Sequence, residues 1–216
     1  MHILATSLDE AWFLTLRAII QEGLSYQIER GSFVGQHRLE LPFLALEIAD
    51  PFRQLIPIVP IGVPAPTSQE YVDGYLLYLM TPAKGDGEQY TYGARLAPWL
   101  PTVIAMLKTT PQTNQACMEV ARPDDILLED PPCLRMVQFK VRPHGLDMFC
   151  CFRSWDVWAW LPSNLAALCM MGRYVAEEVS IPFGHVYAAS MGAHLYEYAW
   201  ELAETVTHIG RAKQSD

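Results

Sequence analysis

Hydrophobic and polar positions along this chain recur at two different spacings, which predict helices in some segments and strands in others. Between Leu8 and Glu22 apolar residues recur every three or four positions, as on one face of a helix, and Gly23 follows as a natural stop. Leu165 to Val179 is apolar on all sides, so we expect a helix buried at the centre of the fold. Further helices are expected at residues 67–80, 96–107 and 197–209.

Alternation with a period of two predicts the strands. We expect a β-meander from residues 32–34, 38–44 and 44–50, and a further strand at 116–121. Residues 136–141 and 146–152 alternate on either side of a Pro143-His144-Gly145 turn, which predicts a hairpin. The returning strand would carry Arg153 and Ser154 to the same sheet edge as Cys133.

The candidate catalytic and binding residues are grouped around Cys133. It follows Pro131-Pro132, which stiffens the entry to the strand and removes backbone donors. A cation such as Arg153 beside a thiol lowers its pKa towards the thiolate that attacks carbon. The same guanidinium could bind a phosphate through two hydrogen bonds, with Ser154 as a further donor. A buried, inert cysteine is the alternative interpretation, and position alone does not decide between them.

Composition narrows the classes of function. The 216 residues, 51% of them hydrophobic, suit one domain spanning 1–216 that buries about 70% of its unfolded surface. A net charge of −9 leaves no basic stripe for a nucleic acid polymer, although a single nucleotide needs only a few focused arginines. The five cysteines form no CxxC pair or metal-ligand spacing, which favours reduced thiols in a cytoplasmic protein. We expect neither a signal peptide nor a membrane span, because there is no basic leader and no apolar run of about 20 residues.

Five motifs occur in an order that carries a family resemblance. They are, along the chain, GSFVGQHRLEL, TYGARL, DPPC, FRSWDVWAWLPSNLAAL and AHLYEYA. Together they resemble the thymidylate synthase superfamily, and most of all its short archaeal, methanogen-type members, which are related to dCMP and CMP hydroxymethylases. The resemblance implies an α/β (α+β) fold in which a large mixed β-sheet is covered by helices, and a homodimer packed sheet to sheet.

The resemblance also implies a reaction. Such enzymes convert dUMP to dTMP: a cysteine thiolate, here Cys133, adds to carbon 6 of the base and makes carbon 5 a nucleophile towards a methylene carrier. The carrier would be 5,10-methylenetetrahydrofolate or 5,10-methylenetetrahydromethanopterin. Tyr92 matches a tyrosine that helps remove the proton from carbon 5, and Glu70 is the best match to a glutamate that organises water and protonates the base. Glu47 is a second candidate for that glutamate, and helix capping is the structural alternative for Glu70.

Further matches imply how the substrates are held. The nucleotide-binding positions correspond to Arg30, Arg153, Ser154, Asn164, His194 and Tyr196. Arg30 would bind the phosphate, or else is a solvated loop arginine, and His194 with Tyr196 would bind the sugar hydroxyl. Asn164 offers a donor and an acceptor to the N3–H and O4 edge of uracil, which favours dUMP over dCMP. Asp156 would face the pterin.

Departures from the family pattern leave alternatives open. Phe152 replaces a glutamine, Trp160 replaces a glycine, and Thr113-Asn114-Gln115 replaces paired arginines that a partner subunit donates to the phosphate. Arg122 or Arg135 could substitute for that pair. A pyrimidine nucleotide 5-hydroxymethylase acting on dUMP, dCMP or CMP, and an inactive nucleotide-binding member of the fold, are therefore alternatives to the methylating enzyme.

Overall fold

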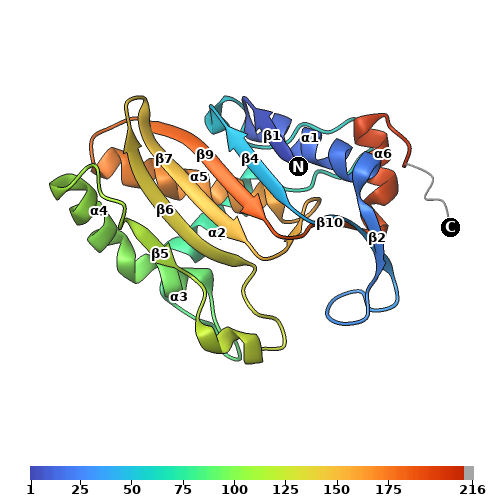
Figure 1. The fold of residues 1–216 in the computed structure, drawn as a ribbon, viewed down its shortest axis with the longest axis horizontal. Coiled ribbons are helices and arrows are strands. Elements are labelled where there is room, and N and C mark those ends of the chain that lie inside the picture. The colour runs from blue at the N-terminus through green and yellow to red at the C-terminus, as the bar shows by residue number, and fades with distance from the viewer. Residues whose placement is uncertain (212–216) are drawn as a thin grey trace.

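Two β-sheets form the framework of the protein, whose computed structural model describes residues 1–211 (Figure 1). The strands are β1 (His2–Ala5), β2 (Leu24–Gln27), β3 (His37–Leu41), β4 (Leu44–Ile48), β5 (Cys117–Glu119), β6 (Leu134–Arg142), β7 (Gly145–Phe152), β8 (Trp155–Asp156), β9 (Phe183–Ser190) and β10 (Ala193–Tyr196). The larger sheet has the order β1-β4-β9-β7-β6-β5, and the smaller has the order β2-β3-β10-β8. Strands β6 and β7 are antiparallel whereas β7 and β9 are parallel, so the large sheet is mixed, as expected.

Helices connect and cover these strands. In residues 1–211 the α-helices are α1 (Leu8–Glu22), α2 (Gln69–Met80), α3 (Tyr92–Leu96), α4 (Leu100–Thr109), α5 (Leu161–Glu178) and α6 (Trp200–Thr207). Short 3₁₀ helices are η1 (Pro51–Arg53), η2 (Ala97–Trp99), η3 (Pro123–Leu127) and η4 (Glu197–Ala199). None of the helices in this part of the chain is long and apolar enough to cross a membrane.

The helices lie mainly on one face of the larger sheet. Helix α5 packs against β7, β9 and α2, and it is the crossover that the parallel strands β7 and β9 require. Figure 1 shows α5 and α2 behind the larger sheet, whose near face over β6, β7 and β9 carries no helix from residues 1–211. The expected central helix is therefore confirmed, although it begins at Leu161 because Pro162 fits the first helical turn.

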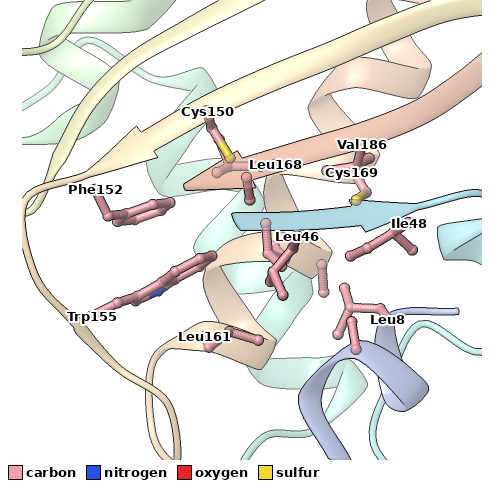
Figure 2. Close-up of a cluster of buried hydrophobic side chains, with 14 of the residues drawn as sticks. Leu8, Leu46, Ile48, Cys150, Phe152, Trp155, Leu161, Leu168, Cys169 and Val186 are labelled. Carbon is pink, nitrogen blue, oxygen red and sulfur yellow. The ribbon is translucent and has the colours of Figure 1, made fainter. Parts of the chain in front are cut away.

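A continuous apolar core fills the space between the larger sheet and α5 (Figure 2). Leu46 and Cys150 point from their strands towards Leu168 of α5, and Val186 lies beside Cys169 of the same helix; all five side chains are buried. The two rings that close the core at the end of β7 are stacked, with the centroids of Phe152 and Trp155 3.9 Å apart. Burial raises the pKa of the Cys150 thiol, as expected for a structural cysteine.

The predicted hairpin around the candidate nucleophile is confirmed. Strands β6 and β7 pair from Leu134, opposite Phe152, to Arg142, opposite Gly145. Gly145 has φ of 148°, and a Cβ there would lie 2.6 Å from the Pro182 carbonyl oxygen, so the turn requires glycine. Both ends of the hairpin on the far side from this turn, before Leu134 and after Phe152, therefore lie together.

The predicted meander is wrong in two respects. Residues 32–34 form a turn between β2 and β3, because Gly31 and Gly35 adopt φ of 91° and 89° and reverse the chain. Strands β3 and β4 follow one another in sequence but belong to different sheets. Apolar alternation has the same appearance in either sheet, so the sequence pattern could not separate them.

Candidate active site

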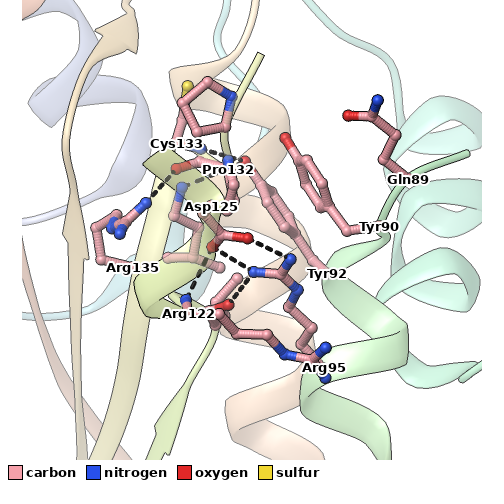
Figure 3. Close-up of polar contacts among 12 residues, drawn as sticks. Gln89, Tyr90, Tyr92, Arg95, Arg122, Asp125, Pro132, Cys133 and Arg135 are labelled. Atoms are coloured by element: carbon pink, nitrogen blue, oxygen red, sulfur yellow. Dashed lines mark hydrogen bonds and ion pairs between the residues drawn. The ribbon is translucent and has the colours of Figure 1, made fainter. Parts of the chain in front are cut away.

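Cys133 is held by its backbone at the entry to β6. Its amide donates to the Tyr92 hydroxyl at 3.2 Å, and the amide of Leu134 donates to the same oxygen, also at 3.2 Å (Figure 3). A tyrosine hydroxyl has two acceptor sites and one proton, so both lone pairs are used and the O–H remains available. The structure therefore brings the predicted Tyr92 directly to the predicted nucleophile.

The position of Tyr92 depends on the glycine that follows it. A Cβ on Gly93 would lie 2.1 Å from the carbonyl oxygen of Tyr78 and 2.2 Å from that of Thr81, so only glycine lets α3 approach the end of α2. Thr91 caps α3 by accepting a hydrogen bond from the Ala94 amide at 2.9 Å. The Tyr-Gly pair of the sequence motif thus reflects a close backbone approach that aims the tyrosine at Cys133.

Arg153 lies beside Cys133, as the hairpin predicted. The Arg153 amide donates to the Cys133 carbonyl at 2.8 Å, across the paired ends of β6 and β7. Its guanidinium donates to the Pro131 carbonyl at 2.6 Å and to the Asp130 carboxylate at 3.3 Å. The two prolines have carbonyl acceptors but no amide protons. Arginine only donates hydrogen bonds, so it suits this segment as a partner.

A second arginine flanks the same turn. Arg135 donates from Nη1 to the Pro132 carbonyl at 3.0 Å, and Figure 3 shows it beside Cys133. Burial raises the pKa of the Cys133 thiol, while the charges of Arg153 and Arg135 lower it; the net shift is upward. The resting thiol is therefore neutral, with both arginines favouring the thiolate.

A buried ion pair supports this edge of the site, and sequence reasoning missed it. Arg95 and Asp125 make two hydrogen bonds of 2.6 Å each, and the same guanidinium donates to the Val120 carbonyl at 2.6 Å. Asp125 also accepts from the Arg122 amide at 2.8 Å, which ties η3 to α3 (Figure 3). Hydrogen bonding to Arg95 lowers the pKa of the Asp125 carboxyl, so the pair is ionised at neutral pH. The TYGARL motif contained the signal, since its arginine falls on the helix face that must be buried.

Asn164 is buried in the first turns of α5. Its Oδ1 accepts from the Trp155 indole at 3.0 Å, and its Nδ2 donates to the Tyr75 hydroxyl at 3.0 Å. Neither Trp155 nor Tyr75 was predicted as a site residue. Tyr75 belongs to α2, so α2 and α5 meet through the side chain of the predicted base-binding residue.

A row of tyrosines leads along α2 towards Cys133. Ring centroids are 6.4 Å apart between Tyr71 and Tyr75, 5.5 Å between Tyr75 and Tyr78, and 6.5 Å between Tyr78 and Tyr92. Tyrosines at positions i, i+4 and i+7 share one face of a helix, and this spacing in the sequence was the signal that could have identified them. The face of α2 that reaches the site is therefore aromatic.

Glu70 is not among the residues that the structure brings to Cys133. It is exposed in the first turn of α2, where the Ser68 side chain caps the helix by accepting from the Tyr71 amide at 3.2 Å. At about 100° per residue, Glu70 lies about 140° around the helix from Tyr75. Glu47, on β4, has its carboxylate 3.7 Å from the His185 ring, on the face of the sheet opposite to the α5 core.

His194 is a buried neutral histidine with one unused nitrogen. Its Nδ1 lies 3.0 Å from the Gly192 carbonyl and 3.3 Å from the Ser154 hydroxyl. A carbonyl only accepts, so Nδ1 carries the proton, and Nε2 is a buried acceptor with no partner in residues 1–211. Burial lowers the pKa of His194 to about 4, which keeps this tautomer neutral at pH 7. The arrangement suits a ligand that donates, such as a hydroxyl.

Tyr196 connects His194 to the loop that carries Arg30. The Tyr196 ring lies edge-on to His194, with centroids 4.7 Å apart, so the two face the same side as expected. Phe33 packs on Tyr196 at 4.7 Å and on Tyr198 at 5.6 Å. The loop between β2 and β3 therefore rests on this aromatic cluster, with Arg30 exposed next to it.

Asp156 is buried at the end of β8 and shapes the turn before α5. Its Oδ1 accepts from the Trp158 amide at 3.0 Å and the Ala159 amide at 3.2 Å. The Tyr198 hydroxyl donates to its Oδ2 at 3.4 Å. Burial raises the pKa of Asp156 while these bonds lower it, and the net shift is upward. In residues 1–211, no group of three or more His, Cys, Asp and Glu side chains could hold a metal ion.

Comparisons with known proteins agree with this fold and motif order. The chain is 28% identical over 211 residues to a Methanosarcina mazei protein named "Putative thymidylate synthase", an alignment spanning 94% of this chain and 93% of the other. A protein of the same name from Methanothermobacter thermautotrophicus is 35% identical over 127 residues, 56% of this chain and 57% of its own. The solved structure of thermostable thymidylate synthase A from Bacillus subtilis has the same fold, with a TM-score of 0.74 and 15% identity over 96% of this chain and 86% of the other.

A family model gives the most specific match. The model described as "Thymidylate synthase" matches residues 91–215, which is more than half of the chain. The matched segment begins immediately before Tyr92 and contains Cys133, Arg153, Asn164 and His194. The chain therefore belongs to the thymidylate synthase family.

Proposed function

We propose that the chain transfers a one-carbon unit from a methylene-tetrahydropterin to carbon 5 of dUMP and yields dTMP. The observation that carries the proposal is the meeting of three sequence motifs at one thiol, where Tyr92 and Arg153 each bond the backbone of Cys133. Carbon 5 of uracil is a poor nucleophile until addition at carbon 6 breaks the conjugation of the ring. A thiol beside hydroxyl and guanidinium groups supports that addition.

In the first step the Cys133 sulfur would bond to carbon 6, and the electron pair of the carbon 5–carbon 6 double bond would move towards O4. The thiol proton would pass to water as the base binds, and the charges of Arg153 and Arg135 favour the thiolate that remains. Tyr92 has only its O–H left to offer, because its lone pairs accept two amides. We therefore assign it the role of orienting the water that accepts the proton from carbon 5.

We propose that the nucleotide is bound by the residues predicted for this role that lie around the smaller sheet. The unpartnered Nε2 of His194 needs a donor, and a sugar hydroxyl supplies one beside the Tyr196 ring. Arg153, with Ser154, and Arg30 from its exposed loop would hold the phosphate. Of the two arginines left open from sequence, Arg135 is next to Cys133, so we assign it rather than Arg122 to the phosphate.

The residues before α5 fit a flat carrier that offers hydrogen bonds. Asp156 presents a buried carboxylate bonded to Tyr198, and Trp160 has 46% of its surface exposed in the same turn. When bound, 5,10-methylenetetrahydrofolate or 5,10-methylenetetrahydromethanopterin supplies the one-carbon unit and the hydride. Asp156 has a raised pKa, so it is suited to share a proton with a pterin ring nitrogen.

We also propose a homodimer in the cytoplasm, formed through the near face of the larger sheet in Figure 1. Apolar and aromatic side chains alternate outward there: Phe149 and Tyr187 stack at 4.8 Å, and Leu4 is 63% exposed. A second copy of this face would cover them. The free thiols of the described chain are compatible with a reducing compartment.

The proposal is tested by tritium release from carbon 5 of labelled dUMP, dCMP and CMP, with either carrier present. We expect release from dUMP that requires Cys133, measured against Cys133→Ala, and a product with the mass of dTMP. A product with the mass of a hydroxymethyl nucleotide would favour the hydroxymethylase instead. No release from any nucleotide would favour an inactive, nucleotide-binding protein.

A further inference from the structure

The orientation of the Asn164 amide is fixed by its neighbour Trp155. An indole N–H is a donor only, so the Asn164 atom 3.0 Å from Trp155 Nε1 must be the carbonyl oxygen Oδ1. The amide nitrogen therefore points to Tyr75, whose hydroxyl oxygen it reaches at 3.0 Å. Trp155 itself is buried and held flat against Phe152, with rings 3.9 Å apart and 10° from parallel. Asn164 thus has one allowed orientation without breaking a buried hydrogen bond.

The resulting hydrogen bonds run in one direction. Trp155 donates to Asn164, and Asn164 donates to Tyr75. The Tyr75 oxygen accepts from Asn164, so its proton is free to donate to another group, and the hydrogen bonds of residues 1–211 include none that Tyr75 donates. Hydrogen bonds arranged head to tail polarise one another, so the terminal O–H is a strengthened donor.

This terminal donor lies in the reaction site. Tyr75 stacks on Tyr78, whose ring contacts Tyr92, and Tyr92 bonds the Cys133 amide. Burial raises the pKa of Tyr75, and the nearby Tyr92 and Cys133 raise it further, so the hydroxyl keeps its proton throughout the neutral pH range. The free O–H of Tyr75 and the Cys133 thiol therefore lie in the same part of the candidate site.

We propose that Tyr75 is a substrate-binding residue that donates its hydroxyl proton to the 4-oxo group of the pyrimidine, in a direction set by Trp155 through Asn164. The inference rests on the proposed function, since it names the residues that select the base. Uracil presents an acceptor at carbon 4, whereas cytosine presents an amino donor there. Against that amino group the Tyr75 oxygen could accept with its second lone pair, but the Tyr75 proton would then have no acceptor. The chain cannot reverse to relieve this, because turning Asn164 would leave the Trp155 N–H buried and unpaired.

The experiment measures equilibrium binding of dUMP and dCMP to the full chain without carrier. Tyr75→Phe removes one hydroxyl and keeps the ring stack, so dUMP should bind about tenfold more weakly while dCMP changes little. Trp155→Phe keeps the stack on Phe152 but frees the Asn164 amide to turn, so the dUMP preference should fall in the same direction. Tyr71→Phe is the matched control, because Tyr71 is exposed on the same helix and its hydroxyl has no bonded partner in residues 1–211.

The outcomes separate this inference from the proposed function. A reduced ratio of dUMP to dCMP affinity in both Tyr75→Phe and Trp155→Phe, with an unchanged ratio in Tyr71→Phe, is the expected result. An unchanged ratio in Tyr75→Phe, with a circular dichroism spectrum like that of the wild type, overturns the role of Tyr75 and leaves the proposed function standing. A wild-type protein that binds neither nucleotide overturns both.

Discussion

The edge of the site that carries Cys133 and the loop that carries Arg30 are built in opposite ways. Cys133 is fixed through main-chain bonds to Tyr92 and Arg153, above the buried pair of Arg95 and Asp125. The Arg30 loop is exposed and rests on the smaller sheet through the Phe33 ring, which packs on Tyr196 and Tyr198. The proposed nucleophile is therefore preorganised, whereas we expect the loop to adjust when a ligand binds.

This difference predicts which substitutions should change folding stability and which should change nucleotide binding. Groups under Cys133 are buried and bonded, so removing one leaves a charge or a donor unpaired. Groups in the Arg30 loop are exposed, so removing one changes little in the free protein. Variants on the two sides should thus separate stability from nucleotide affinity.

The largest expected effect is the loss of the buried ion pair. Asp125→Ala should lower the free energy of unfolding by about 3–5 kcal/mol, because Arg95 is left charged and buried. Urea unfolding followed by fluorescence measures it. Asp124→Ala, one residue away and exposed, should stay within about 0.5 kcal/mol of the wild type. Equal losses in both variants would contradict the structural role of the pair.

The next effect concerns pH and His194. Its pKa is about 4 in the folded protein against 6.5 as the ordinary value, so the unfolded chain binds a proton first as pH falls. Folding stability therefore drops as pH falls from about 7 to 4, by about 2 kcal/mol at pH 5. Urea unfolding at pH 7 and pH 5 should show this difference in the wild type but not in His194→Asn. The same pH dependence in both proteins would mean that other groups cause it.

On the loop side, Phe33→Ala should act on nucleotide binding. The ring is 44% exposed, so we expect a loss of about 1 kcal/mol or less in folding stability. The dUMP KM should rise about three- to tenfold with kcat nearly unchanged, because the loop loses its contact with Tyr196 and Tyr198 and must be ordered by the ligand. Val34→Ala, in the same turn and 61% exposed, is the control. A fall in kcat with KM unchanged would contradict this interpretation.

The smallest expected effect is on thiol reactivity. The Asp130 charge raises the pKa of Cys133 and the Arg153 charge lowers it. At pH 7 to 8, Asp130→Asn should therefore speed alkylation of Cys133 a few-fold and Arg153→Met should slow it, because the thiolate fraction changes in those directions. Peptide mass spectrometry after iodoacetamide treatment distinguishes Cys133 from the other cysteines. Equal rates in all three proteins would show that burial alone sets the reactivity.

Local features of the site were predictable from the sequence because their signals are local. The hairpin, with Cys133 beside Arg153, follows from alternation and one Pro-His-Gly turn, and His194 shares a face with Tyr196 because they are two residues apart in a strand. Tertiary pairings were not predictable in this way. Arg95 pairs with Asp125, which lies 30 positions further along the chain, and no periodicity of the sequence links the two residues.

The case of α2 shows the same limit. The sequence pattern located α2 from its capping residues to Met80. It did not show which face of the helix packs on α5, and therefore did not show that Glu70 is exposed and Tyr75 points inward. The inward face is the one that packs on α5, where Asn164, far away in sequence, donates to Tyr75. The aromatic spacing of α2 held the information, yet a stripe of tyrosines is equally typical of an ordinary core face.

The most direct test of the central claim is the mass of the Cys133 peptide after incubation with 5-fluoro-dUMP and either methylene carrier. Fluorine replaces the proton that must leave carbon 5, so the covalent species should persist. We predict that the peptide containing Cys133 gains the mass of the nucleotide plus the carrier, and that Cys133→Ala gains none. An unmodified Cys133 in a protein that still converts dUMP, or label on another residue, would contradict the account.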